Sequence, residues 1–120
     1  MEKRKNKYDL EERTLNFSKE IIKFCKKLSK NTINFKLIDQ LIRSAGSIGA
    51  NYREANDALS KKDFIHRLKI ARKEARETTY WLKLVQEANP NKDTKQLIIE
   101  SKELRNILSA IINKIIDEVN

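Results

Sequence analysis

Glycine and proline are scarce in this chain of 120 residues, which contains two glycines and one proline. Because the turns of sheet-rich proteins depend on these two residue types, their scarcity favours long helices joined by short connections. No stretch rich in glycine, proline or serine separates one part of the chain from another. We therefore expect a single domain over residues 1–120, a length sufficient for one modest hydrophobic core.

Cysteine and histidine occur once each, as Cys25 and His66. Cys25 cannot form an internal disulfide, and its position on the apolar side of a helical pattern indicates a small buried residue. His66 has no cysteine nearby, so one chain cannot assemble a zinc site or a histidine-based catalytic unit, and we expect a surface residue. Glu74 and Glu77 lack the Glu-x-x-His partners of a di-metal centre and are expected to pair with neighbouring arginines. The sequence therefore predicts a protein that is not an enzyme and holds neither a metal nor a cofactor.

Long apolar runs are also absent, because no stretch approaches the roughly 18 uncharged residues that a membrane span needs. The charged residues 1–7 are followed by Tyr8, Asp9 and Leu10 and then by two glutamates, which is not the apolar run of a secretory signal. These absences predict a cytoplasmic protein with no membrane contact.

Apolar residues recur at helical spacing in four stretches, and we expect helices at about 9–29, 33–58, 61–89 and 92–118. Asp9 is the expected N-cap of the first helix, and Ser60, with Asp63 three residues later, is the expected N-cap of the third. Asn89 and Pro90 end the third helix, because proline restricts the residue that precedes it. Connections of a few residues favour antiparallel neighbours, so the predicted fold is an all-α, up-down-up-down four-helix bundle.

Both glycines lie within residues 43–51, inside the second predicted helix, where each costs about 1 kcal/mol relative to alanine. Ala45 and Gly49 are four residues apart, as are Gly46 and Ala50, so each pair shares a helix face and lets another helix approach closely. A phosphate-binding loop is excluded, since the stretch has neither a preceding strand nor a following Lys-Ser or Lys-Thr. The residues assigned to helix packing or to a subunit interface are Arg43, Ala45, Gly46, Gly49, Ala50, Asn51, Glu54 and Trp81.

Two of these assignments rest on separate arguments. Glu54 is expected to pair with Arg43 or Arg53 across an interface. Trp81 lies on a second apolar strip of the third helix, which indicates a core or interface position, with stacking on a ligand or a base as the alternative. Apolar arcs on the second, third and fourth helices are broader than one subunit needs and indicate burial between subunits.

The net charge of +9 is distributed unevenly. Residues 1–30 carry ten lysines and arginines against five acids, and residues 61–90 carry eight against four, whereas the other two blocks of thirty are neutral. At ~100° per residue, six cations of the third helix fall within about a third of its circumference, opposite the predicted core face. This cationic stripe consists of Lys62, Lys69, Arg72, Lys73, Arg76 and Lys83.

The stripe has two interpretations. A charged face keeps a helical protein in solution, although a face of mixed sign would do so equally well. Positive charge segregated along a rigid helix is instead typical of a protein that follows a phosphate backbone, with salt-sensitive binding and little sequence preference.

Several motifs together resemble a known family: residues 39–51, which read DQLIRSAGSIGAN, residues 54–55 and 62–64, residues 70–77, which read IARKEARE, and residues 81–82. They resemble the bacterial four-helix-bundle family encoded in intervening sequences of 23S ribosomal RNA genes. That family is related to the accessory variability protein of diversity-generating retroelements, a basic pentameric barrel that binds nucleic acid and a reverse transcriptase. The resemblance implies a homo-oligomer, with five subunits as the expected number, and a reverse transcriptase as a partner.

Two hypotheses follow. The first is a non-enzymatic, oligomeric accessory protein that binds RNA or DNA with low sequence specificity, through phosphate contacts along the cationic stripe. The second is a protein-protein assembly scaffold without a physiological nucleic-acid ligand, in which the charge serves solubility.

Overall fold

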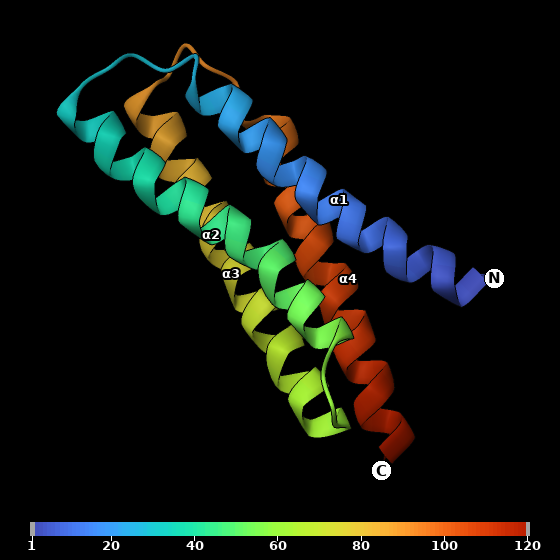
Figure 1. Ribbon diagram of the computed structural model, residues 1–120. Helices are drawn as coiled ribbons and strands as arrows, with labels where there is room; N and C mark the ends of the chain where they lie inside the picture. The colour runs from blue at the N-terminus through green and yellow to red at the C-terminus, as the bar shows by residue number, and fades with distance from the viewer. Residues whose placement is uncertain (1, 120) are drawn as a thin grey trace.

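The computed structural model describes the backbone of residues 2–119 and the side chains of residues 10–118. It contains four α-helices in that range, α1 (Glu2–Cys25), α2 (Thr32–Asn56), α3 (Lys61–Ala88) and α4 (Lys95–Val119). No strand occurs among residues 2–119, so the prediction of an all-α protein with four helices is confirmed. Figure 1 shows the α1–α2 and α3–α4 connections at one end of the molecule and the α2–α3 connection at the other.

Side chains that cap the helices explain where α2 and α3 begin. Ser60 Oγ accepts the backbone N–H of Asp63 at 3.1 Å, so the predicted cap of α3 is confirmed. Asn31 caps α2 in the same way, because its Oδ1 accepts the N–H of Asn34 at 2.8 Å. Each cap satisfies one of the backbone donors that the first turn of a helix leaves without a partner.

The predicted bounds of α1 and α4 were wrong. α1 begins at Glu2 and not at Asp9, because residues 2–8 contain no glycine or proline that would stop a helix. It ends at Cys25, where the N–H groups of Lys27 and Leu28 bond carbonyls three residues back, at 3.0 and 3.1 Å, and tighten the last turn.

α4 begins at Lys95 rather than near residue 92 because of a side chain of α3. Gln86 Oε1 accepts both the backbone N–H of Thr94, at 3.0 Å, and its hydroxyl, at 2.8 Å. The Gln86 amide nitrogen also donates to the carbonyl of Lys92. The segment after Pro90 is therefore bonded to α3 until Thr94, and the new helix starts only beyond it.

The core contains the apolar stripes that the periodicity predicted. Its largest fully buried members come from all four helices and include Ile21, Leu41, Ile48, Leu68, Leu82, Leu104, Leu108 and Ile112. Cys25 is also buried, as predicted, and desolvation raises the pKa of its thiol to about 11.

α2 and α3 make the most extensive helix-helix contact in the molecule. Small residues fill the seam between them, since Ser44, Ala71 and Ala75 are all fully buried. The hydroxyl oxygens of Ser44 and Thr78 lie 2.9 Å apart across this seam. Small side chains let the two backbones approach closely, which is what the small-residue stretch of α2 predicted.

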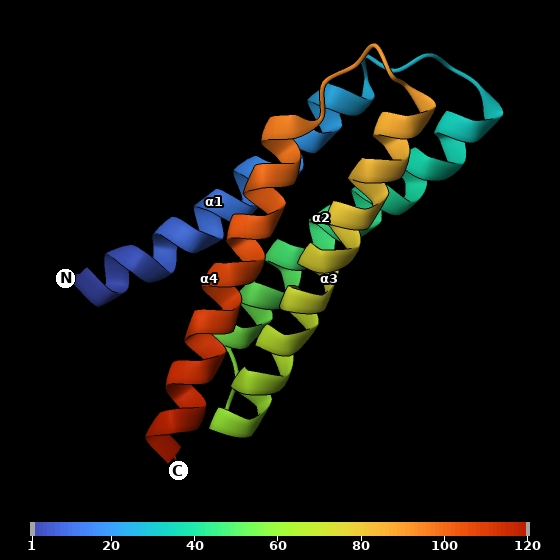
Figure 2. The same ribbon diagram turned by 180° about the vertical axis from the view of Figure 1, so that it is seen from behind.

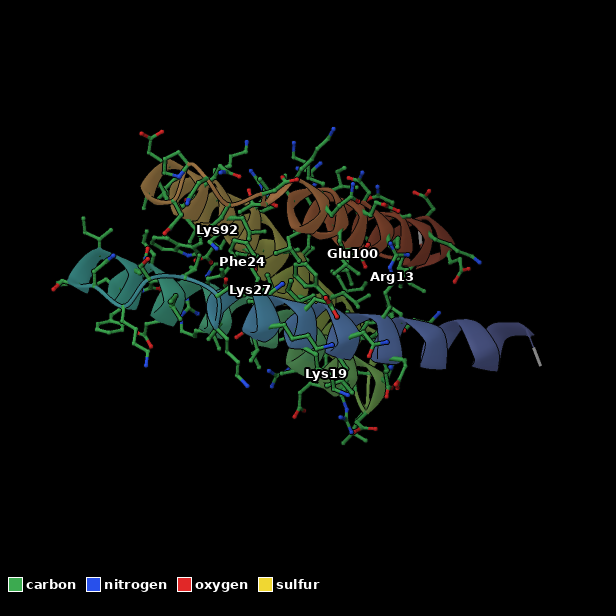
Figure 3. All side chains as sticks on the ribbon, turned by 90° about the horizontal axis from the view of Figure 1, so that it is seen from above. Arg13, Lys19, Phe24, Lys27, Lys92 and Glu100 are labelled. Carbon is green, nitrogen blue, oxygen red and sulfur yellow. The ribbon has the colours of Figure 1, made fainter. Side chains whose placement is uncertain are left out.

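α1 is the least tightly packed helix, because its contacts with α4 and with α2 are the two weakest between neighbouring helices. Figures 1 and 2 show its N-terminal end leading away from the other three helices. A double hydrogen bond nevertheless joins the two, since Arg13 Nε and Nη2 each lie 2.7 Å from an oxygen of Glu100 (Figure 3). Glu100 and Glu103 raise the pKa of the Arg13 guanidinium above its usual value.

Candidate nucleic-acid interface and subunit surface

The six residues of the cationic stripe all lie on α3, and the fold places them on its solvent side. Arg72 is half-buried, whereas Lys62, Lys69, Lys73, Arg76 and Lys83 are exposed. Successive members are spaced by seven, three, one, three and seven residues, and at ~100° per residue these steps keep all six on one side of a helix. The opposite side of α3 holds buried Leu68, Ala75 and Leu82. The prediction that the stripe faces solvent is therefore confirmed for five of its six residues.

Few carboxylates compensate this charge. Lys73 Nζ lies 4.0 Å from Glu77 Oε2, at the limit of an ion pair. Among the described side chains, no carboxylate oxygen lies within 4.0 Å of the charged nitrogens of the other five stripe residues. Glu87, exposed near the end of α3, is one turn beyond Lys83. The positive potential over this face is therefore largely unneutralised.

The start of α3 carries a shallow hollow of about 400 Å³. It is lined by Lys61, Lys62, Ile65, His66 and Lys69, and His66 is exposed, as the sequence predicted. Lysine ammonium groups around a hollow next to a helix N-terminus suit an anion, because both contribute positive potential. Lys61, which was not among the predicted residues, extends the cationic stripe by one residue at this end.

Tyr80 is an exposed aromatic residue within the stripe that was not predicted, and 58% of its surface is accessible. It follows Arg76 by four residues and precedes Lys83 by three, so the three share one face. Its ring meets that of Trp81 nearly at right angles, with centroids 5.2 Å apart and planes at 74°. The signal was present in the sequence as a tyrosine in register with the cations.

Trp81 itself is half-buried and packs against the hydrophobic core, which agrees with the core or interface position predicted for it. Its indole N–H is buried and has no hydrogen-bond acceptor among the described residues. Such a donor costs about 1–3 kcal/mol, because it has lost its water without gaining a partner.

Of the two small-residue pairs of α2, the pair formed by Ala45 and Gly49 faces α1. A Cβ atom at Gly49 would lie 2.9 Å from Thr14 Oγ1 and 3.2 Å from Thr14 Cβ, so this position admits only glycine without a shift. One turn earlier the Ser18 hydroxyl donates to the Ala45 carbonyl at 3.1 Å. The prediction that a neighbouring helix comes close to this pair is confirmed.

The pair formed by Gly46 and Ala50 is exposed, and nothing lies within 4 Å of a Cβ atom placed at Gly46. Within the subunit the expected neighbouring helix therefore covers Gly49 but not Gly46, and the assignment of Gly46 to a subunit interface stays a prediction. The reason is that α1 crosses α2 on the side of Gly49. A depression of about 250 Å³ remains at this place, with Leu15 and Arg53 on its borders.

Comparison with known proteins identifies the family. The family model described as 23S rRNA-intervening sequence protein matches residues 6–110. The chain belongs to this family. A crystal structure at 1.70 Å of a protein with unknown function from the S23 ribosomal protein family of Bacteroides thetaiotaomicron VPI-5482 is similar to it, with 36% identity and a TM-score of 0.79. That match covers 89% of this chain and 97% of the other, and no curated protein matches.

In this intervening-sequence protein an arginine joins α2 to α3. Arg43 Nη1 lies 3.6 Å from Glu74 Oε1, and its Nη2 lies 3.7 Å from Glu77 Oε1, so the expected pairing of both glutamates with an arginine is confirmed. Burial raises the pKa of Glu74, and the charge of Glu77 raises it further, while Arg43 opposes both effects. Glu54 is exposed, and its expected partner Arg43 is engaged within the subunit.

Asn51, assigned to an interface, is half-buried and donates to the Ser47 carbonyl of its own helix at 2.9 Å. Among the described side chains, no group of three or more histidines, cysteines and carboxylates is arranged to hold a metal ion. Within residues 2–119, none of the helices is both long and apolar enough to cross a membrane.

Proposed function

We propose that this intervening-sequence protein is a non-enzymatic, oligomeric protein that binds nucleic acid through the phosphate backbone. The observation that carries the proposal is the cationic stripe of α3, which is exposed and has few carboxylates within reach. Cations held along a rigid helix displace the counterions that surround a nucleic acid, so binding gains free energy without contact to the bases. Contacts of this kind do not distinguish one sequence from another.

The same proposal includes a homo-oligomer of antiparallel four-helix bundles, with five subunits as the expected number. Exposed apolar side chains on α1 and α2 support it: Leu15 is 44% exposed, Ile22 41%, Phe35 58% and Ile42 38%. They lie on α1 and α2, the two helices that line the depression at Gly46. Nothing in the subunit lies within 4 Å of a Cβ atom placed at this glycine. A helix of another subunit could approach closely there, because glycine and alanine leave room for its side chains. In such a ring the cationic stripes would be repeated around the assembly.

The second candidate is a scaffold that binds protein, for which the same exposed apolar residues are the favouring observation. In that case the stripe would serve solubility. A reverse transcriptase, expected from the resemblance, stays a prediction under either candidate.

A charge-reversal experiment separates the two candidates. Lys69, Arg76 and Lys83 would be replaced together by glutamate, and the matched control would replace exposed Lys95, Lys102 and Lys114 of α4. Both triple variants change the net charge by the same amount, so a difference between them reports position rather than total charge. Retention of a labelled RNA and a labelled DNA on filters would be measured at two salt concentrations, with light scattering to count subunits.

We expect the α3 variant to lose retention while its assembly is unchanged, and the α4 variant to keep most of it. The wild-type protein should lose affinity steeply as salt rises, since each phosphate contact adds to the salt dependence. Equal retention of nucleic acid by the two variants, or binding that does not change with salt concentration, would favour the scaffold.

A further inference from the structure

An exposed aromatic residue lies within the cationic stripe, between its last two members. Tyr80 keeps 58% of its surface accessible although α3 has a complete core face of its own. At ~1.5 Å of rise per residue, Arg76 lies about 6 Å before it along the helix axis and Lys83 about 4.5 Å after it. A nucleic-acid strand whose phosphates contact these two cations would pass over the phenol ring.

Trp81 restricts the movement of this ring. The two rings meet with centroids 5.2 Å apart and planes at 74°, which is the edge-to-face arrangement that aromatic pairs prefer. Because Trp81 is half-buried and packs against the hydrophobic core, it provides a fixed support. A ring that is already held in place loses little conformational entropy when a ligand stacks on it.

We propose that Tyr80 stacks on the base of an unpaired nucleotide, so that the stripe binds single-stranded nucleic acid in preference to a duplex. The inference rests on the proposed function, since the flanking cations supply the phosphate contacts. A flat aromatic ring between cations is the combination with which proteins follow single strands, because every base presents a π-face whatever its sequence. In a duplex the bases are paired and stacked on each other, so the ring has nothing to contact.

The test compares three probes of equal length: an oligothymidine strand, the same strand with abasic sites in place of its bases, and a duplex. The variants are Tyr80→Ser, which removes the ring, and Tyr80→Phe, which keeps it. Ile99→Ser is the control, because Ile99 is also an exposed apolar residue, at 40%, and lies on α4, outside the stripe and outside the proposed subunit contact. Circular dichroism would establish that each variant is folded.

We expect Tyr80→Ser to weaken binding of the oligothymidine about 5- to 150-fold, the range found for loss of one base-aromatic stack. Its binding of the abasic strand and of the duplex should stay within about twofold of wild type, as only phosphate contacts remain there. Tyr80→Phe and Ile99→Ser should bind all three probes as wild type does.

A second measurement needs no variant. A strand carrying 2-aminopurine should lose fluorescence when the wild-type protein binds it, because stacking on an aromatic ring quenches this base. Fluorescence that stays constant at saturation would overturn the proposal. So would an equal loss of affinity for all three probes in Tyr80→Ser, or an affinity of this variant for the oligothymidine that equals that of wild type. These failures leave the proposed function intact provided that the α3 charge reversal abolishes binding. If the wild-type protein binds none of the probes, the proposed function and the stacking fail together.

Discussion

Asn34, at the start of α2, and Asn89, at the end of α3, hold each other through two buried side-chain hydrogen bonds. Asn34 Nδ2 donates to Asn89 Oδ1 at 3.1 Å, and Asn89 Nδ2 donates to Asn34 Oδ1 at 2.9 Å. The remaining amide hydrogens are also used, because Asn34 donates to the Ser29 carbonyl and Asn89 to the Val85 carbonyl, at 2.8 and 2.9 Å. The pair therefore ties the connection between α1 and α2 to the C-terminal end of α3.

Replacing Asn34 by alanine should lower the free energy of unfolding by about 1–3 kcal/mol, because the buried amide of Asn89 is left without its partner. The double variant Asn34→Ala/Asn89→Ala should cost less than the sum of the two single variants, since each loss includes the same bonds. Urea unfolding of the four proteins measures the coupling. Strictly additive losses would show that the two amides do not depend on each other.

Alanine at the two glycines should have opposite effects on stability. Gly46→Ala should raise the free energy of unfolding by about 0.5–1 kcal/mol, because the added methyl group has open space and alanine favours the helix. Gly49→Ala should lower it by about 1–3 kcal/mol, because the methyl group meets buried Thr14, whose hydroxyl is held by the Glu11 carbonyl at 3.0 Å.

Thermal unfolding over a range of protein concentrations would measure both glycine variants. Gly46→Leu is the companion variant that tests the proposed subunit contact, since a large side chain there would block another helix without touching α1. An assembly that tolerates Gly46→Leu would place the contact elsewhere on the surface.

The stability difference between Glu74→Gln and wild type should depend on pH. The folded pKa of Glu74 is raised by burial and by Glu77, so the folded state prefers the protonated carboxyl more than the unfolded state does. Stability from this group is therefore fully present below the unfolded pKa of about 4.5 and is lost as the pH rises through the higher folded pKa. Glutamine resembles the protonated acid, so the variant should gain stability relative to wild type between about pH 4 and neutrality.

Chemical denaturation of both proteins at pH 3.5, 5 and 7 provides the measurement, and Asn51→Gln would control for the exchange of a polar side chain on the neighbouring helix. A difference that is constant across this range would mean that Glu74 keeps its ordinary pKa in the folded protein.

Cys25 should resist alkylation in the folded protein. Its pKa of about 11 leaves roughly one thiol in a thousand ionised at pH 8, and the side chain is also buried. Reaction with a thiol reagent should therefore be at least ~100-fold slower than in the denatured protein, where a cysteine has its ordinary reactivity. Modification at equal rates in both states would contradict the buried position.

The periodic features of this protein could be predicted from sequence because they depend on neighbours along the chain. The exposure of Lys69 and Lys83 follows from their spacing relative to the core face, and the Ser60 cap follows from a side chain that reaches only three residues ahead. Burial of Cys25 follows from the same helical spacing.

Features that depend on where one helix crosses another could not be predicted. Gly46 and Gly49 are equivalent in the sequence pattern, and only the path of α1 decides which of them is covered. Asn34 and Asn89 are 55 residues apart, and two buried amides give no periodic signal. Tyr80 was in register with the stripe, but an exposed tyrosine becomes informative only when its surroundings are known.

The sparse contact between α1 and α4 has a consequence for how the protein opens. Because α2, α3 and α4 share the more extensive contacts, α1 is the segment whose separation exposes the least core per residue released. Amide protons of α1 should exchange with deuterium when α1 alone separates from the other helices. Those in the middle of α3 should exchange only when the whole domain unfolds cooperatively. The first helix would thus behave as a separate foldon, and the ion pair between Arg13 and Glu100 would hold it to α4.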